Sequence, residues 1–175
     1  LRLSIACYAS LPAMWQTLPD LGTGIIYAIL VAAAYTFAVS IAAGRGRPRL
    51  LEAARFGGYA TCAFIALGTV LLAYAFITHD FRIRYVARYS DRSMPTAYLF
   101  ASLWGGQDGS LLWWSALLAG YTSFCLRWMK GRYRQLQPYV IATLMSIIGF
   151  FAVLMLFAAN PFSTSMSGAA VDGEG

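Results

Sequence analysis

The chain alternates between long uncharged apolar stretches and short connections that hold nearly all of its charged residues. Four stretches are long enough to be membrane-spanning helices: 21–44, 56–78, 109–126 and 138–159. Because a helix rises about 1.5 Å per residue, roughly 20 residues cross a hydrocarbon core about 30 Å thick. The third stretch is short but sufficient. The pattern therefore predicts an all-α integral membrane protein with about four transmembrane helices.

The two ends of the chain differ from these stretches. Residues 1–20 mix Arg2, Pro12, Pro19 and Asp20 with apolar residues, and we interpret them as an N-terminal lead segment rather than a spanning helix. Asn160-Pro161 closes the fourth helix, and residues 161–175 are typical of a loop. The first residue is leucine and the last nine are of loop composition, so we expect a piece of a longer protein.

Composition supports the membrane interpretation. Hydrophobic residues make up 59% of the chain and charged residues 11%, whereas soluble domains carry about 25% charged residues. The net charge of +6 comes from 13 Lys and Arg that lie between apolar stretches. A nucleic-acid-binding protein gathers such residues on one folded face, so we expect membrane lipid and no nucleic acid as a partner.

The positions of the cations predict an orientation. The connections after the first and third helices hold eight of them, and the segment between the second and third helices holds four, namely Arg82, Arg84, Arg88 and Arg92. The positive-inside rule places the first group in the cytoplasm. Both termini and segment 79–108 would then be periplasmic, in a bacterial inner (cytoplasmic) membrane.

Segment 79–108 has two recognisable parts before its end. Residues 80–88 alternate between polar and apolar positions with period two, which predicts an extended segment at a membrane interface. Pro95 can open a helix, and residues 96–104 are apolar but too short to span a bilayer. We expect an interfacial or re-entrant helix there.

The segment ends in a polar break, whose letters WGGQDGS run from 104 to 110 and are followed by LLWW. In one interpretation it is a structural corner, where Asp108 or Ser110 caps the third helix and a carboxylate suits its positive dipole end. Glycines would supply the tight turn, and Trp104, Trp113 and Trp114 would form an interfacial belt. In the other interpretation the break is a surface for a ligand or partner.

No residue pattern predicts catalysis or a metal site. Ligands of the right type do not converge at a spacing that suits zinc, and phosphate-loop, nucleophile-elbow and Rossmann patterns are absent from the sequence. His79 is the only histidine. Beside Asp80 it could ligate haem, but an interfacial histidine is more often simply solvated. We assign no catalytic and no metal-binding residue.

Four segments carry a family resemblance: 19–22 (PDLG), 75–87 (AFITHDFRIRYVA), 104–114 (WGGQDGSLLWW) and 160–163 (NPFS), with Ser90, Pro95 and Tyr98 between them. Together they resemble the N-terminal part of CcmF, the cytochrome c-type biogenesis protein, over about residues 19–165. The nitrite-reductase-dedicated relative of CcmF would look much the same here.

The resemblance implies a subunit of the haem lyase that attaches haem covalently to apocytochrome c. In that family haem arrives on the periplasmic chaperone CcmE, and the apocytochrome is presented with CcmH and CcmI. The full-length family member carries haem b on histidines and holds the incoming haem in a tryptophan-rich periplasmic domain.

This chain lacks the histidines and the W-G-x-W-W-x-W-D signature of that family. We therefore expect a scaffold and a docking surface rather than a complete lyase. Two other classes stay open: a fragment of a transporter or channel whose polar break lines a pathway, or a plain membrane anchor. The candidate residues for docking a partner or haem are Trp104, Gly105, Gly106, Gln107, Asp108, Gly109, Ser110, Trp113 and Trp114.

Overall fold

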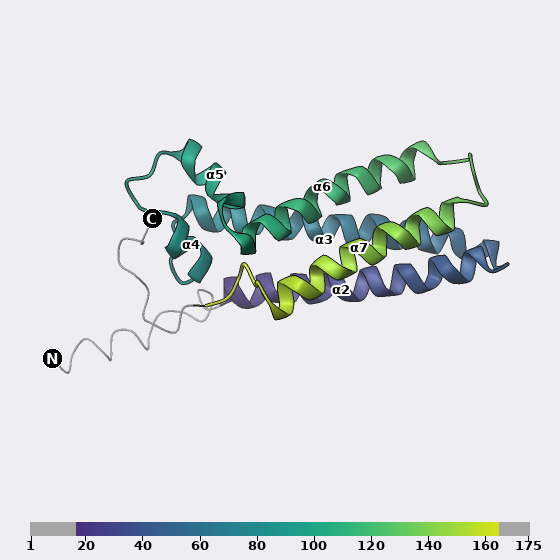
Figure 1. Ribbon diagram of the computed structural model, residues 1–175, viewed down its shortest axis with the longest axis horizontal. Coiled ribbons are helices and arrows are strands. Elements are labelled where there is room, and N and C mark those ends of the chain that lie inside the picture. The colour runs from purple at the N-terminus through teal and green to yellow at the C-terminus, as the bar shows by residue number, and fades with distance from the viewer. Residues whose placement is uncertain (1–16, 165–175) are drawn as a thin grey trace.

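The computed structural model describes residues 17–164, and this part of the chain is a bundle of long helices with two short helices at one end (Figure 1). Helices α2 and α6 lie diagonally opposite each other, and each packs against both α3 and α7. The predicted all-α fold is confirmed. Most of the predicted lead segment and loop 161–175 lies outside the described residues. The long helices are α2 Thr17–Gly44, α3 Leu51–Ile77, α6 Gln107–Trp128 and α7 Gln137–Phe157.

Three helical segments are long and apolar enough to cross a membrane: Leu18–Gly44, Pro48–Ile77 and Gln137–Phe157. These spans show a membrane protein. Helix α6 is long enough as well, but serines, threonines and tryptophans make it less apolar than the other three. A fourth crossing by α6 stays a prediction.

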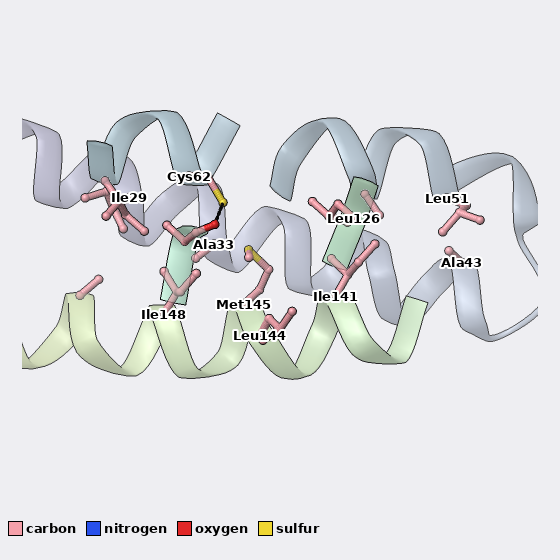
Figure 2. Close-up of a cluster of buried hydrophobic side chains, with 14 of the residues drawn as sticks. Ile29, Ala33, Ala43, Leu51, Cys62, Leu126, Ile141, Leu144, Met145 and Ile148 are labelled. Atoms are coloured by element: carbon pink, nitrogen blue, oxygen red, sulfur yellow. Dashed lines mark hydrogen bonds between the residues drawn. The ribbon is translucent and has the colours of Figure 1, made fainter. Parts of the chain in front are cut away.

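The centre of the bundle is filled by aliphatic side chains from all four long helices (Figure 2). Ile29, Ile65 and Ile148 are fully buried there. Small residues let the helices approach closely, which gives the van der Waals contact that holds helices together in lipid. A hydrogen bond also joins two of the helices: the thiol of Cys62 on α3 donates to the carbonyl oxygen of Ala119 on α6 at 3.3 Å.

Four buried hydroxyl groups inside these helices bond back to their own helix. The hydroxyls of Thr36, Thr61, Ser115 and Thr122 are buried, and each donates to the carbonyl oxygen four residues earlier, at 2.7 to 2.9 Å. This local bond satisfies a hydroxyl without a partner on another helix. Such residues can therefore lie in a lipid environment, where an unsatisfied polar group is costly.

The two ends of the bundle differ (Figure 1). One end, here called the basic end, consists of connections 45–50 and 129–136, and the first contains the 3-10 helix η2 Pro48–Leu50. The other, here called the motif end, holds α4 Arg84–Tyr89, α5 Thr96–Gly105 and residues 158–164. The start of α2 and the end of α7 both lie at the motif end. Helix α5 corresponds to the short helix expected at 96–104.

The expected extended segment at 80–88 is wrong, because residues 84–89 form helix α4. Its strand-like character is limited to an isolated antiparallel bridge between Ile83 and Thr164. The physical reason is a second pattern in the same residues: Ile83, Val86, Ala87 and Ser90 are all buried and recur at helical spacing. Burial of this face outweighs the period-two alternation.

Candidate docking corner

The motif end joins segments that are far apart in sequence, beginning with the residues after α7. Asn160 accepts a hydrogen bond from the Phe162 amide at 2.9 Å and donates to the Thr23 hydroxyl on α2 at 3.2 Å. The buried ring of Phe162 lies against Gly22, where any Cβ atom would overlap it. Segments 19–22 and 160–163 therefore form one packed unit.

The turn after α3 continues this unit. His79 adopts a left-handed conformation with φ of 52°, and the Asp80 amide donates back to the Ala75 carbonyl oxygen at 2.9 Å. This is the usual way in which a helix ends, although glycine more often takes that position. Arg82 pairs with the nearly buried Asp80 carboxylate, with Nε 2.8 Å from Oδ1.

His79 is half-buried rather than solvated, which corrects the expectation from sequence. Its Nε2 atom is buried and has no hydrogen-bond partner within the described residues, and its ring meets the edge of Phe81. Its observed role is to end α3. The residues that follow His79 contact the connection after α7, because the Arg84 amide donates to the Ser163 carbonyl oxygen at 2.9 Å.

Tyr85 on α4 connects the two helices that meet at the polar break. Its side chain is buried, with 2% of the residue exposed. Its hydroxyl donates to the Ser102 carbonyl oxygen at 2.8 Å, in the last turn of α5, and accepts from the Gly106 amide at 3.1 Å, where α6 begins. One phenol group thus satisfies a carbonyl at a helix end and an amide at a helix start, both of which lack partners within their own helices.

Two glycines of the break are required by close packing. A Cβ atom at Gly106 would overlap the ring of Tyr89, and one at Gly109 would overlap both the Tyr85 hydroxyl and the Leu103 carbonyl oxygen. Neither glycine has a positive φ among the described residues. These positions need glycine because a side chain would not fit, not because the backbone takes an unusual conformation. The sequence had instead suggested glycines for a tight turn.

The predicted cap of α6 by Asp108 or Ser110 is wrong. Gly106 is the N-cap residue, and it makes no side-chain capping bond. The Ser110 hydroxyl donates instead to the Gln107 carbonyl oxygen at 2.9 Å. Asp108 lies in the first turn of α6, where a carboxylate suits the helix dipole, and faces Arg84 at 3.8 Å. Residues within α6 are poorly placed to cap it. The Tyr85 hydroxyl instead accepts a hydrogen bond from the amide of Gly106, the residue at which α6 begins.

Burial sets the protonation of this connection. Burial is the main cause that raises the pKa of Tyr85 to about 12; the hydrogen bond from the Gly106 amide lowers this pKa, and the nearby Tyr89 and Asp108 add to the rise. The hydroxyl is therefore neutral at physiological pH and keeps the proton that it donates to Ser102. The group holds the corner together and has no tendency to act as a base.

The surface of the corner is aromatic and polar. Trp104, Gln107 and Trp114 are exposed, with Trp104 46% and Trp114 59% exposed. The Trp104 ring leans on that of Trp113, with centroids 5.1 Å apart. The predicted site residues thus fall into three groups by burial. Gly106 and Gly109 are buried, and Asp108, Ser110 and Trp113 are partly buried. The exposed group is Trp104, Gly105, Gln107 and Trp114.

The described residues of this corner form no cluster of metal-ligating side chains. No group of three or more His, Cys, Asp or Glu lies close enough to hold a metal ion in residues 17–164. The chain contains one histidine, so it cannot supply two histidine ligands to one haem. What the corner offers chemically is a rigid surface with two exposed indoles, a carboxamide and a partly exposed Arg84–Asp108 pair.

Comparison with known proteins gives consistent similarities. The chain is 30% identical over 161 residues to the cytochrome c-type biogenesis protein CcmF of Pseudomonas aeruginosa, which is 89% of this chain and 24% of that protein. It is 32% identical over 149 residues to NrfE of Haemophilus influenzae, covering 83% of this chain and 23% of that protein. No family model matches the chain.

A solved structure has the same fold. The cytochrome c haem lyase CcmF superimposes with a TM-score of 0.75 at 27% identity, covering 86% of this chain and 25% of that one. Fold and sequence together define a helical membrane protein that is similar to the cytochrome c biogenesis proteins. Among these proteins it resembles CcmF. It spans about a quarter of the length of the curated relatives that it matches.

Proposed function

We propose that the chain is the N-terminal part of a haem lyase subunit that supports covalent attachment of haem to apocytochrome c. The observation that carries this proposal is the similarity to CcmF over 89% of the chain, together with the shared fold. A transporter fragment or a plain anchor is not favoured by these similarities. By resemblance to CcmF, bond formation and haem b would belong to the full-length protein, and we assign neither of them to a residue of this chain.

The predicted topology belongs to this proposal. Four crossings, including α6, would place the motif end and both termini in the periplasm and the basic end in the cytoplasm. Charge supports it, because six cations lie at the basic end, Arg55 and Arg127 lie in the helices beside it, and four cations lie in segment 79–108. The membrane would be the bacterial inner membrane, where haem is attached on the periplasmic side.

The docking corner would serve as a partner surface. The hydroxyl of Tyr85 fixes α5 to α6, so Trp104, Gln107 and Trp114 would be held in place before a partner arrives. Preorganised aromatic side chains lose little conformational entropy on binding. The partners implied by the CcmF similarity are the chaperone CcmE, CcmH, CcmI and apocytochrome c. The corner would position one of them and would not take part in the chemistry.

Complementation tests the functional proposal. The matched 161 residues of Pseudomonas aeruginosa CcmF would be replaced by those of this chain, in cells that lack their own CcmF. We expect the chimera to restore covalent haem in cytochrome c, measured by haem staining of denaturing gels. A chimera that reaches the membrane at normal level but restores no covalent haem would contradict the proposal.

Labelling of single cysteines tests the topology. In a background with Cys7, Cys62 and Cys125 all replaced by alanine, Gln107→Cys at the motif end should react with a membrane-impermeant maleimide in intact cells. Arg49→Cys, exposed at the basic end, is the matched control and should react only after permeabilisation. The reverse pattern would overturn the orientation, and reaction of both sites in intact cells would show that the two ends lie on the same side.

A further inference from the structure

A pocket lies at the basic end of the bundle, between the end of α2, the start of α3 and the segment that leads into α7. Its volume is about 590 Å³, within the range of about 300–1,000 Å³ typical of small-molecule sites. The pocket lies outside the docking corner, at the opposite end of the bundle. Its wall includes Ala43, Leu51, Pro138 and Tyr139, and its polar lining consists of Glu52, Arg134 and Gln135.

The wall of the pocket is held in place by a contact between α2 and α7. The Tyr139 hydroxyl donates to the Gly44 carbonyl oxygen at 3.1 Å, at the last residue of α2. The Tyr139 ring lies over Gly44 so closely that a Cβ atom there would need the ring to move. Ala43 and Leu51 are buried beside it. The apolar side of the pocket is therefore preformed.

The charge around the pocket is strongly one-sided. One carboxylate, Glu52, lies at this end within the described residues, and Arg55 binds it at 3.0 Å, so its charge is already offset. Because cations outnumber carboxylates at this end of the bundle, an anion entering the pocket would meet a net positive charge. Arg134 lines the pocket, and the two connections at this end also hold Arg45, Arg47, Arg49, Lys130 and Arg132.

We propose that this pocket binds the headgroup of an anionic phospholipid. A basic pocket between helix ends, at the level where apolar spans give way to charged connections, matches the chemistry of such a headgroup. Arg134 would bind the phosphate and Gln135 would donate to headgroup oxygens. The apolar wall of Ala43, Leu51 and Pro138 would contact the glycerol and upper acyl region. The proposal does not depend on the role of the chain in haem attachment.

Native mass spectrometry of the purified 175-residue chain in detergent tests the site. Phosphatidylglycerol and phosphatidylcholine would be offered at equal concentration, and we expect preferential binding of phosphatidylglycerol. Because Arg134 lines the pocket and one cation close to an anionic lipid contributes about fivefold in affinity, Arg134→Gln should weaken phosphatidylglycerol binding about fivefold. Arg132→Gln is the matched control: it removes the same charge at the same end, outside the pocket lining, and should weaken binding less than twofold.

Two further measurements distinguish a headgroup site from general charge attraction and from a site for free phosphate. Gln135→Glu puts a carboxylate at the pocket and should weaken phosphatidylglycerol binding at least as much as Arg134→Gln, which keeps the test valid if one variant is unstable. A large excess of inorganic phosphate should not displace the lipid. Equal binding of both lipids, equal losses in Arg134→Gln and Arg132→Gln, or displacement by phosphate would each overturn the proposal.

Discussion

Replacing Tyr85 by phenylalanine removes one hydroxyl and leaves the ring that fills the space between α4 and the corner. The Gly106 amide would then be buried without a partner, and the Ser102 carbonyl oxygen would lose its 2.8 Å bond. A buried unsatisfied group costs about 1–3 kcal/mol, and the carbonyl is exposed enough for water to replace part of its bond. We expect the corner to open more easily by about 1–3 kcal/mol.

Hydrogen exchange measured by mass spectrometry reports this change directly. An opening free energy lower by about 1–3 kcal/mol corresponds to exchange about 5- to 150-fold faster in residues 102–110. Tyr89→Phe is the matched control, since the Tyr89 hydroxyl makes no hydrogen bond within residues 17–164. Exchange in Tyr85→Phe that stays within twofold of the wild type would refute the role of Tyr85 in holding the corner.

Tyr85→Phe should also change how the stability of the fold depends on pH. The pKa of Tyr85 lies at about 12 in the folded chain against an ordinary value of 10.0. A raised pKa means that the neutral hydroxyl stabilises the fold fully below pH 10, and this stabilisation is lost as the pH rises toward 12. Thermal unfolding should therefore show a steeper stability loss between pH 10 and 12 in the wild type than in Tyr85→Phe. Parallel curves would contradict the assignment.

Three further substitutions test the packing of the motif end by thermal unfolding in detergent. Gly109→Ala should lower stability by about 1–3 kcal/mol through overpacking. The control is Gly120→Ala, in open space on the same helix, which should leave stability unchanged or raise it by up to about 1 kcal/mol. Equal effects of the two substitutions would contradict the close packing at Gly109. Asp108→Ala should cost less than about 1 kcal/mol, and salt should shrink the difference, because only a helix-dipole interaction and a loose ion pair are lost. His79→Gly should be neutral or stabilising by up to about 1 kcal/mol, because it relieves a left-handed conformation; a large loss would show that the imidazole does more than end α3.

Much of the bundle could be predicted from the sequence because lipid allows few solutions. Uncharged stretches of 18 residues or more must satisfy their own backbone groups, and a helix does this without outside partners. The four predicted ranges all fall on long helices, α2, α3, α6 and α7. Bilayer thickness and backbone bonding are sufficient for this inference.

The interior of the corner could not be predicted, because it depends on contacts distant in sequence. Tyr85 is one of eleven tyrosines, and nothing local shows that its hydroxyl reaches the corner at Gly106. The helical spacing of Ile83, Val86 and Ala87 was a usable signal for α4, but the period-two alternation of the same residues masked it. The capping hypothesis failed because local rules offered Asp108 a role that a residue of α4 performs.

The proposed role of the corner, a preorganised surface for a partner in cytochrome c maturation, can be tested by crosslinking in cells. A photoreactive amino acid would replace Gln107, which is exposed at the corner, in the CcmF chimera. The same probe at Phe124, exposed farther along α6, is the control for lipid contact. We expect Gln107 to crosslink to CcmE, CcmH, CcmI or apocytochrome c, and Phe124 to crosslink to none of them. Crosslinks from Gln107 to lipid alone, in cells that mature cytochrome c normally, would contradict a docking role.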